Sequence, residues 1–339
     1  MKFVYLGRTG LKVSELCLGT MTFGRETDEN TARTMMDYFV EVGGNFFDTA
    51  NVYSNGASEE ILGRWQKEHG ERENLVLATK VHFPMGKGPN DLGLSRKHIM
   101  SQVERSLERL QTDYVDLYQM HCWDPGTPLE ETLLTLNDLV RTGKVRYIGA
   151  SNFAGWQLTK ALTTSKANHW GQFACVQMQY NLLERYIEWE MLPVCRDSGV
   201  GLLAWSPLGG GWLTGKYRLE GGRPNGDSRV ANAQPWQEEF WEKRDKEKTW
   251  VIVNTVLDIA TRRRVPPAQV ALNWLRAQPC ITAPIIGART LEQLDENLKC
   301  LNWELDAEEK PRLDQMSEPS FPYPYRYIRD FARESANHH

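Results

Sequence analysis

Eight short apolar segments recur along the 339-residue chain, and they constrain its fold more than any other feature. They span residues 16–19, 45–50, 75–81, 115–121, 145–152, 173–181, 200–208 and 282–287. Several are rich in Val, Ile, Phe and Tyr, which is typical of buried parallel strands. The chain is therefore expected to build a sheet whose strands are covered on both faces.

Segments with helical periodicity lie between these runs. Apolar residues recur at the spacing of one helix face over residues 32–40, 99–110, 129–140, 252–260 and 291–298. Alternating strands and helices predict a parallel sheet with helices outside it, either as an open doubly wound sheet or as a closed barrel. Eight units without a mid-chain linker favour the closed (β/α)8 TIM barrel, formed by one domain over residues 1–339 with its core at 3–300.

Two common nucleotide-binding motifs do not fit the sequence. No GxGxxG follows any predicted strand, which argues against an ordinary Rossmann domain. Residues 210–217 read GGWLTGKY and fit GxxxxGK, but Tyr217 stands where a P-loop carries the Ser or Thr that binds magnesium. The sequence therefore predicts neither of these sites, and we expect no bound metal ion.

Composition excludes several classes of partner. The chain has 40 Lys and Arg against 44 Asp and Glu, a formal net charge of −4, so its electrostatics do not favour nucleic acid or an anionic membrane. No uncharged run approaches the roughly 18 residues of a membrane span, and residues 1–10 lack the apolar core of a signal peptide. The six cysteines form no CxxC pair and several lie in apolar runs, which is typical of reduced thiols. We expect a soluble cytoplasmic protein.

Two segments fall outside the strand and helix repeat. Residues 208–246 are rich in Gly, Asn and Asp, and loops of this length are usually functional. The tail at 302–339 contains FPYPYRY at 321–327, where the prolines are expected to prevent a regular helix. Both segments are predicted to cover one mouth of the barrel.

Four side chains at strand ends form a candidate proton-transfer group: Asp48, Tyr53, Lys80 and His121. The active site of such a barrel lies at the C-terminal ends of its strands, so these residues are expected to converge. Each alone is more simply a solvated or capping residue, but together they can transfer a proton.

The chemistry of this group follows from its ionisable side chains. The Lys80 ammonium is expected to lower the pKa of the Tyr53 phenol, and Asp48 to hold Lys80 in place. Tyr53 can then protonate a carbonyl oxygen while hydride reaches its carbon, with His121 hydrogen-bonded to the same oxygen. Because no side chain supplies hydride, a nicotinamide cofactor is required.

These residues lie in motifs that resemble the aldo-keto reductase family. Residues 48–63, DTANVYSNGASEEILG, are similar to the family's signature at its second strand, and residues 143–153, GKVRYIGASNF, to the signature at its fifth. LVLATK from residue 75, VDLYQMH at 115–121 and PIIGARTLEQLDEN at 284–297 extend the match, so that it spans roughly residues 3–300. The family includes enzymes and proteins similar to the β-subunits of voltage-gated potassium channels.

The resemblance implies roles for residues by their positions in these motifs. Asp48, Tyr53, Lys80 and His121 match the family's catalytic tetrad. The implied cofactor-binding set begins with Thr20, with the carboxamide-binding Ser151, Asn152 and Gln177, and with Trp205 stacked on the nicotinamide ring. The remaining implied residues, along the pyrophosphate and the adenosine end, are Ser206, Leu208, Gly210, Lys216, Gly287, Arg289, Gln293, Glu296 and Asn297.

Arg289 favours NADPH over NADH. A guanidinium near a helix start suits a 2′-phosphate, whereas selectivity for NAD usually employs a carboxylate on the ribose hydroxyl. The alternative is that Arg289 is a solvated residue and Glu296 sets the choice.

The sequence is consistent with more than one class of carbonyl substrate. Phe23, Phe83, Trp123 and Trp212 are candidate pocket walls, although aromatic residues also fill cores. The leading hypothesis is NADPH-dependent reduction of an aldehyde or ketone by a monomer or small homo-oligomer. The alternatives are an enzyme for sugar-derived carbonyls, including uronate breakdown products, and a regulatory protein similar to a channel β-subunit.

Overall fold

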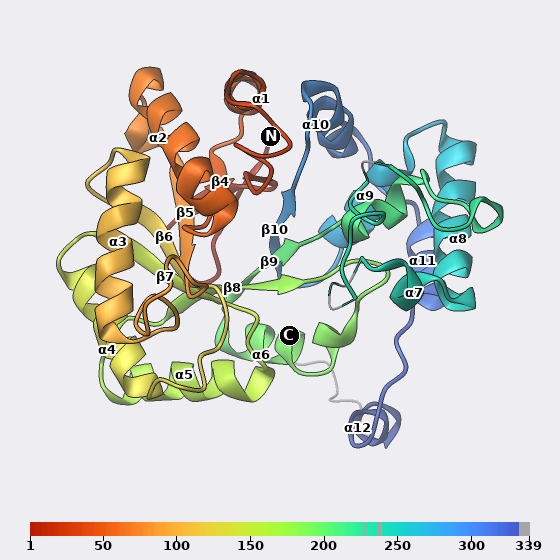
Figure 1. Ribbon diagram of the computed structural model, residues 1–339. Coiled ribbons are helices and arrows are strands. Elements are labelled where there is room, and N and C mark those ends of the chain that lie inside the picture. The colour runs from red at the N-terminus through yellow and green to blue at the C-terminus, as the bar shows by residue number, and fades with distance from the viewer. Residues whose placement is uncertain (227, 236, 238, 332–339) are drawn as a thin grey trace.

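A closed barrel of eight parallel strands forms the centre of the computed structural model, which describes residues 1–226, 228–235, 237 and 239–331 (Figure 1). In the order in which they pair around the barrel, the strands are β10 (Ile281–Ile286), β3 (Cys17–Gly19), β4 (Phe46–Asp48), β5 (Val76–Val81), β6 (Val115–Met120), β7 (Val145–Ser151), β8 (Phe173–Gln179) and β9 (Gly201–Trp205). Each lies within one of the predicted apolar segments or departs from it by a single residue. The predicted (β/α)8 barrel is confirmed.

The barrel has two hydrophobic clusters because its strands are buried on both faces. Residues such as Phe46, Leu117 and Leu203 belong to a cluster inside the barrel, and a larger cluster joins the outer face of the strands to the helices. Alternate residues of a strand point to opposite faces. An inward-facing side chain at the last residues of a strand therefore lies near the C-terminal mouth of the barrel.

An antiparallel hairpin that the apolar pattern did not reveal precedes the barrel. It consists of β1 (Phe3–Tyr5) and β2 (Lys12–Ser14), and its Leu6 and Val13 are fully buried in the inner cluster. Gly7 has φ +56° at the tip, and a Cβ there would lie 2.4 Å from the carbonyl oxygen of Ala174. The hairpin therefore packs against the N-terminal end of the barrel.

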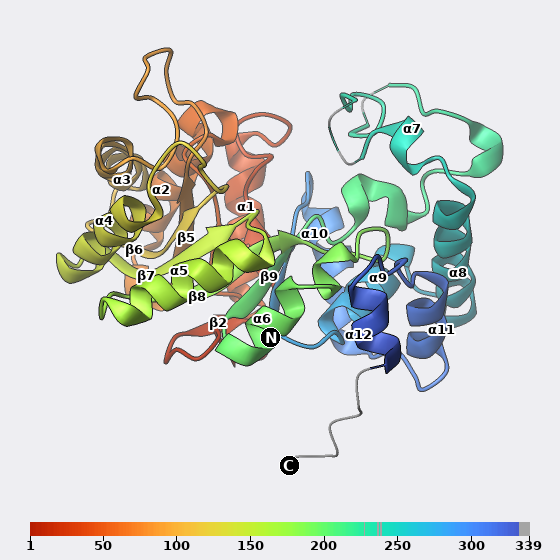
Figure 2. The same ribbon diagram turned by 90° about the horizontal axis from the view of Figure 1, so that it is seen from below.

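Helices surround the barrel in the sequence order of a (β/α)8 fold (Figures 1 and 2). They are α1 (Glu29–Glu41), α2 (Ala57–His69), α3 (Arg96–Leu110), α4 (Leu129–Arg141), α5 (Gly155–Ala167), α6 (Met191–Ser198), α8 (Glu247–Arg263), α9 (Pro267–Arg276) and α10 (Leu291–Leu298). The five predicted helical segments correspond to α1, α3, α4, α8 and α10. Asp28, Ser95 and Thr290 cap α1, α3 and α10 by accepting a backbone N–H. Among the described residues, no helix has the length and apolar character to cross a membrane.

The long loop at 208–246 is anchored by tryptophans. It contains the short 3-10 helices η4 (Gly209–Thr214) and η5 (Leu219–Gly221), and α7 (Trp241–Arg244). Trp212 is fully buried, with its ring centroid 5.0 Å from that of Trp241 and 5.4 Å from that of Trp250. These contacts fix both ends of the loop against α8. Residues 227, 236 and 238 of this segment lie outside the described residues.

The tail forms two helices, α11 (Glu309–Met316) and α12 (Tyr325–Phe331). The expectation of no regular helix at 321–327 is wrong for its last three residues. Pro322 and Pro324 precede the first turn of α12, where a missing N–H costs no helical hydrogen bond. Tyr325 stacks on Trp189 at a ring-centroid distance of 5.9 Å, which places this part of the tail against the connection between β8 and α6. Residues 332–339 lie outside the described residues.

Candidate active site

The four predicted proton-transfer residues meet at the C-terminal mouth of the barrel. Asp48 ends β4, Lys80 lies near the end of β5, and His121 follows β6. Tyr53 begins the 3-10 helix η1 (Tyr53–Gly56), five residues after Asp48. All four lie within one connected group of contacts.

Lys80 is the hub of this group. Its fully buried Nζ donates to Asp48 Oδ1, to the carbonyl oxygen of Thr49 at 2.9 Å and to Tyr53 Oη at 3.1 Å. An ammonium has three hydrogens, so all three have an acceptor. Burial alone would lower the pKa of Lys80, but Asp48 and Tyr53 outweigh it and raise that pKa above its ordinary value. Lys80 is therefore a cation at neutral pH.

The environment of Tyr53 raises rather than lowers its pKa. Burial has the largest effect and raises the pKa, Lys80 lowers it, and Asp48 raises it further. Lys80 lowers the pKa of Tyr53 as expected, but the expected net lowering is wrong. The free-energy cost of burying the phenolate exceeds the stabilisation that the Lys80 cation provides. The phenol is thus protonated at neutral pH, as a proton donor must be.

His121 is a neutral imidazole beside Tyr53. The two ring centroids are 5.8 Å apart in an edge-on arrangement. Burial, together with the positive charge of Lys80 and the nearby His82, holds the pKa of His121 well below its ordinary value. Its Nδ1 is buried and has no hydrogen-bond partner among the described residues. The ring can therefore offer one N–H to an oxygen held next to Tyr53.

Gln119 belongs to the site and was missed by the sequence analysis. Its Nε2 donates to Asp48 Oδ2 at 3.0 Å, and Gln177 Nε2 donates to the same oxygen at 2.8 Å. The available signal was alternation along β6: Gln119 lies two residues before His121 and so faces the same side of the strand. Asp48 is thereby held by Lys80 on one oxygen and by two amides on the other.

Arg229 of the long loop was also missed. Its Nε pairs with Glu239 Oε1 at 2.8 Å, and its Nη2 lies 3.7 Å from Met21 Sδ, next to the end of β3. Its positive charge acts with that of Lys80 to lower the pKa of Tyr53 against the effect of burial. This contact brings the long loop to the mouth of the barrel, as predicted for the segment.

Several residues of the predicted nicotinamide site surround this group. Ser151 Oγ is buried without a hydrogen-bond partner among the described residues, as is Trp205 Nε1. Asn152 has φ +54° and donates from Nδ2 to the carbonyl oxygen of His121 at 2.8 Å. Thr20 is fully buried and hydrogen-bonds to Ser58 Oγ at 2.7 Å. An unsatisfied hydroxyl beside a buried amide fits a ligand that carries a carboxamide.

The predicted phosphate and adenosine residues lie on two segments next to the mouth. Ser206, Leu208, Gly210 and Lys216 follow β9 on the long loop, where Ser206 has φ +54° and Gly210 φ +66°. Gly287, Arg289, Gln293, Glu296 and Asn297 lie after β10 and on α10.

Arg289 lies just before the N-terminus of α10. Its backbone N–H donates to Gln293 Oε1 at 3.0 Å, and its Nη2 is 4.0 Å from Glu26 Oε1. Glu296 is exposed and Asn297 is buried. Free N–H groups and the helix dipole favour an anion at a helix start.

Two of the four predicted substrate walls are corrected by their burial. Phe23 and Trp212 are both 0% exposed and pack in the outer hydrophobic cluster, so neither lines an open pocket. Phe83 is 36% exposed, and its ring centroid lies 4.7 Å from that of His121. Residue type alone does not reveal which aromatic side chains face inward.

Trp156 adds an aromatic surface that was not predicted. It is 58% exposed, and its ring centroid lies 5.6 Å from that of Trp123, which is half-buried. Trp123 follows His121 by two residues, which places this pair near the C-terminal end of β6.

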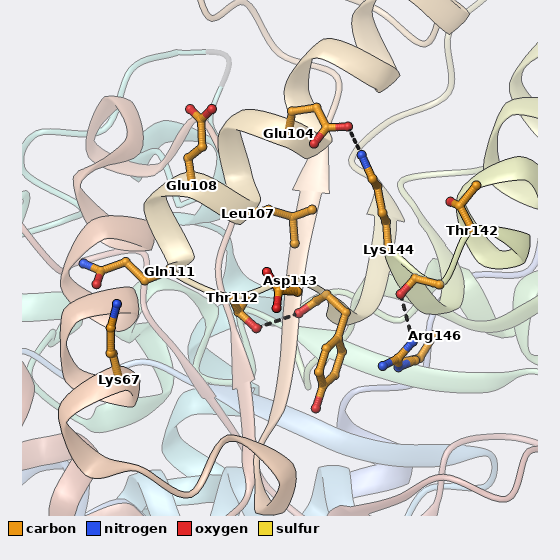
Figure 3. Close-up of a pocket in the computed structure, with 12 residues that line it drawn as sticks. Lys67, Glu104, Leu107, Glu108, Gln111, Thr112, Asp113, Thr142, Lys144 and Arg146 are labelled. Carbon is orange, nitrogen blue, oxygen red and sulfur yellow. Dashed lines mark hydrogen bonds and ion pairs between the residues drawn. The ribbon is translucent and has the colours of Figure 1, made fainter.

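A hollow of about 970 Å³ lies at the other end of the barrel (Figure 3). It is lined by the ends of α2 and α3 and by residues 142–146, which lead into β7, and the ion pair of Glu104 with Lys144 crosses it. These residues precede strands rather than follow them. The hollow contains none of the predicted site residues, and the N-terminal face of such a barrel serves stability rather than catalysis.

Comparison with known proteins identifies close relatives over most of the chain. The family model described as "Aldo/keto reductase family" matches residues 15–318. The chain is 45% identical over 317 residues to the "Uncharacterized oxidoreductase YrpG" of Bacillus subtilis, covering 91% of this chain and 93% of that protein. It is 38% identical over 305 residues to a "Probable voltage-gated potassium channel subunit beta" of Oryza sativa, covering 89% and 92%. It is 34% identical over 349 residues to the "Versiconal hemiacetal acetate reductase" of Aspergillus parasiticus, covering 96% and 99%.

Proposed function

The chain belongs to the Aldo/keto reductase family, and from that premise we propose that this oxidoreductase reduces an aldehyde or ketone to an alcohol, using NADPH. The observation that supports the proposal is the hydrogen-bonded series Asp48–Lys80–Tyr53 with His121 beside it. Such a series holds a protonated phenol where a carbonyl oxygen can receive its proton. Hydride is the chemistry that a bound nicotinamide dinucleotide supplies.

Tyr53 is the proton donor in this proposal. Its burial keeps the phenol protonated until a carbonyl oxygen gains negative charge, and the proton then passes from Oη to that oxygen. The carbonyl carbon gains hydride, the oxygen gains the proton, and Tyr53 is left as a phenolate. Lys80, 3.1 Å from Oη, stabilises this phenolate.

His121 orients the substrate. As a neutral ring it donates one hydrogen bond to the carbonyl oxygen, which stabilises the developing charge without competing with Tyr53 for the proton. Phe83 packs against the imidazole and limits the directions from which a carbonyl can approach.

The residues that hold the cofactor are proposed from their free polar atoms. Ser151 Oγ has no other partner among the described residues, and Gln177 has both amide hydrogens engaged, which leaves its Oε1 as an acceptor. A nicotinamide carboxamide carries one acceptor and two donors and can satisfy both atoms. Trp205 provides the adjoining aromatic surface.

The test of the reaction is a panel of carbonyl compounds with NADPH and with NADH, followed by the loss of absorbance of the reduced cofactor. We expect turnover of at least one aldehyde or ketone, and about 100-fold or greater loss of kcat in Tyr53→Phe, because the ring then lacks the proton to donate. Tyr53→Phe should still bind NADPH. Full activity of this variant would remove Tyr53 from the mechanism.

Preference for NADPH is tested at Arg289. Substitution by Ala removes a guanidinium beside the start of α10, where a 2′-phosphate would lie. We expect KM for NADPH to rise about 10-fold or more while KM for NADH changes little, because NADH lacks that phosphate. An equal change in KM for both cofactors would show that another residue sets the preference for NADPH. The exposed Glu296 would be the next candidate.

A regulatory role is the second candidate, because one relative at 38% identity is named as a probable channel β-subunit. The complete proton-transfer group favours the enzyme. Binding of NADPH without turnover of any carbonyl in the panel would favour the regulatory role. Sugar-derived carbonyls, including uronate products, form a separate arm of the panel and test specialisation for them.

We propose that the protein acts in the cytoplasm as a monomer or small homo-oligomer. All six cysteines are free thiols, and four of them are buried, which suits a reducing compartment. Light scattering on the purified protein measures the oligomeric state.

A further inference from the structure

Gln119 connects the proton-transfer group to the proposed nicotinamide site. It is fully buried inside the barrel, between Asp48 and Gln177, which are 2% and 3% exposed. Its Nε2 donates to Asp48 Oδ2 at 3.0 Å, and its Oε1 accepts from Gln177 Nε2 at 3.2 Å. One side chain thus contacts both functional groups of the site.

The chemistry of these groups fixes the direction of each amide. An ionised carboxylate only accepts hydrogen bonds, so the nitrogen of Gln119 must face Asp48 and its oxygen must face Gln177. Gln177 then donates one hydrogen to Asp48 Oδ2 and the other to Gln119 Oε1. Both hydrogens are engaged, so the remaining polar atom of Gln177 is its carbonyl oxygen.

We infer that Gln119 is a positioning residue, which locks the amide of Gln177 with its oxygen toward the nicotinamide carboxamide and shares the charge of Asp48. The inference rests on the proposed function. Without Gln119, one hydrogen of Gln177 loses its acceptor, and only the bond to Asp48 Oδ2 still orients the amide. The cofactor would then bind an amide that is held by one hydrogen bond instead of two.

A purely structural role predicts a different result. An apolar side chain of similar size fills the same space, since Leu117 and Leu203 already belong to the inner cluster. If Gln119 served only to fill the barrel, its replacement by Leu would change stability alone. The two roles are separated by measuring cofactor affinity together with stability.

The first experiment compares Gln119→Leu with Gln66→Leu. Gln66 on α2 is equally suited as a control because it is 3% exposed and donates to the carbonyl oxygens of Leu110 and Gln111 at 2.9 and 3.1 Å, away from the site. NADPH is titrated against tryptophan fluorescence. We expect about 5- to 10-fold weaker binding for Gln119→Leu, the value of one lost hydrogen bond, and no change for Gln66→Leu. Equal NADPH affinity in both variants would overturn the inference.

The second experiment uses Gln119→Glu, because a protonated carboxyl still offers the one donor and one acceptor that Gln119 uses toward Asp48 and Gln177. Burial and the neighbouring Asp48 raise the pKa of the introduced carboxyl above its ordinary value of about 4.3. We expect NADPH affinity close to that of the parent protein near pH 6 and about 10-fold weaker near pH 8.5, where the ionised carboxyl repels Asp48. A pH dependence parallel to that of the parent protein would contradict the assignment.

These outcomes separate the inference from the proposed reaction. If the parent protein binds NADPH but reduces no carbonyl, the reductase proposal fails while the affinity comparison still decides the role of Gln119. If the parent protein reduces carbonyls but Gln119→Leu matches Gln66→Leu, the inference alone fails. Absence of NADPH binding in the parent protein overturns both.

Discussion

Every hydrogen of the Lys80 ammonium is directed at an oxygen of the site: Asp48 Oδ1, the Thr49 carbonyl and Tyr53 Oη. A buried charge with three acceptors cannot be removed without leaving those acceptors behind. In the proposed reaction the same contacts serve stability and catalysis, so a single substitution at this position tests both.

Lys80→Met should lower both stability and turnover. It leaves Asp48 as an unpaired buried carboxylate, and we expect the free energy of unfolding to fall by about 3–5 kcal/mol, measured by urea denaturation. The loss of the cation also leaves the Tyr53 phenolate unstabilised, and we expect kcat to fall about 100-fold or more.

The double variant Asp48→Asn with Lys80→Met is the control for this prediction. It removes the stranded charge, so stability should recover while kcat does not. Recovery of kcat with stability would mean that Lys80 acts only on the fold.

At the residue scale, the sequence predicted those residues of the candidate site that lie at strand ends. Asp48, Lys80 and His121 could be found because an ionisable residue at the C-terminal end of an apolar strand is informative in a barrel. Gln119 could not be found by this route, because it lies within β6 and its partners come from distant strands. The net rise in the pKa of Tyr53 depends on its burial, which the sequence does not display.

Helices α2 and α3 approach each other closely at Gly63. A Cβ built on Gly63 would lie 2.1 Å from the carbonyl oxygen of Arg109, far inside a van der Waals contact. The last glycine of the signature at residues 48–63 is thus required by helix packing. Gly63 also places Glu59 of α2 within reach of Arg109 of α3, whose Nε donates at 2.7 Å.

Gly63→Ala should therefore force the two helices apart. We expect a loss of about 2–4 kcal/mol in the free energy of unfolding, because the clash is with backbone that cannot rotate away. Calorimetry measures the effect. Gly10→Ala is the matched control, since a Cβ there meets nothing within 4 Å. A stable Gly63→Ala protein would show that the helices can separate at little cost.

At the element scale, prediction succeeded for elements that belong to the strand and helix repeat. The eight barrel strands lie in runs of apolar residues, and helices such as α1 and α4 have several buried residues at helical spacing. The β1–β2 hairpin was missed because it lies outside this repeat, and α12 because it follows prolines that dominate the local pattern. Both depend on what they pack against: the barrel interior for Leu6, and Trp189 for Tyr325.

For the whole molecule, three histidines with lowered pKa values predict sensitivity to acid. Burial holds the pKa values of His82 and His98 below their ordinary value, and burial with Lys80 and His82 does the same for His121. The unfolded chain binds protons at these positions below about pH 6.5, whereas the folded protein binds them only at lower pH. Stability is therefore present above pH 6.5 and is lost as the pH falls below it.

The measurement is urea unfolding at several pH values between about 7.5 and 5. We expect the free energy of unfolding to decrease with falling pH by up to about 1.4 kcal/mol per pH unit for each of the three histidines. Replacing His98 by Gln should remove its share of the slope. Carboxylates with lowered pKa values, such as Asp124, act at lower pH and do not enter this window. A flat profile over this range would contradict the lowered pKa values of all three rings.

The barrel closes through a short seam between the two ends of the chain. β3 pairs with β10 through Cys17 with Ile285 and Leu18 with Ile286. During synthesis at about 5–20 residues per second, β3 leaves the ribosome tens of seconds before its partner, and its edge stays open for that time. The strands that carry Asp48, Lys80 and His121 emerge early, whereas Arg289 follows β10 directly. A nascent chain thus contains the proposed acid–base residues long before it can bind the proposed dinucleotide. The translation step that closes the barrel also completes the proposed adenosine end of the cofactor site.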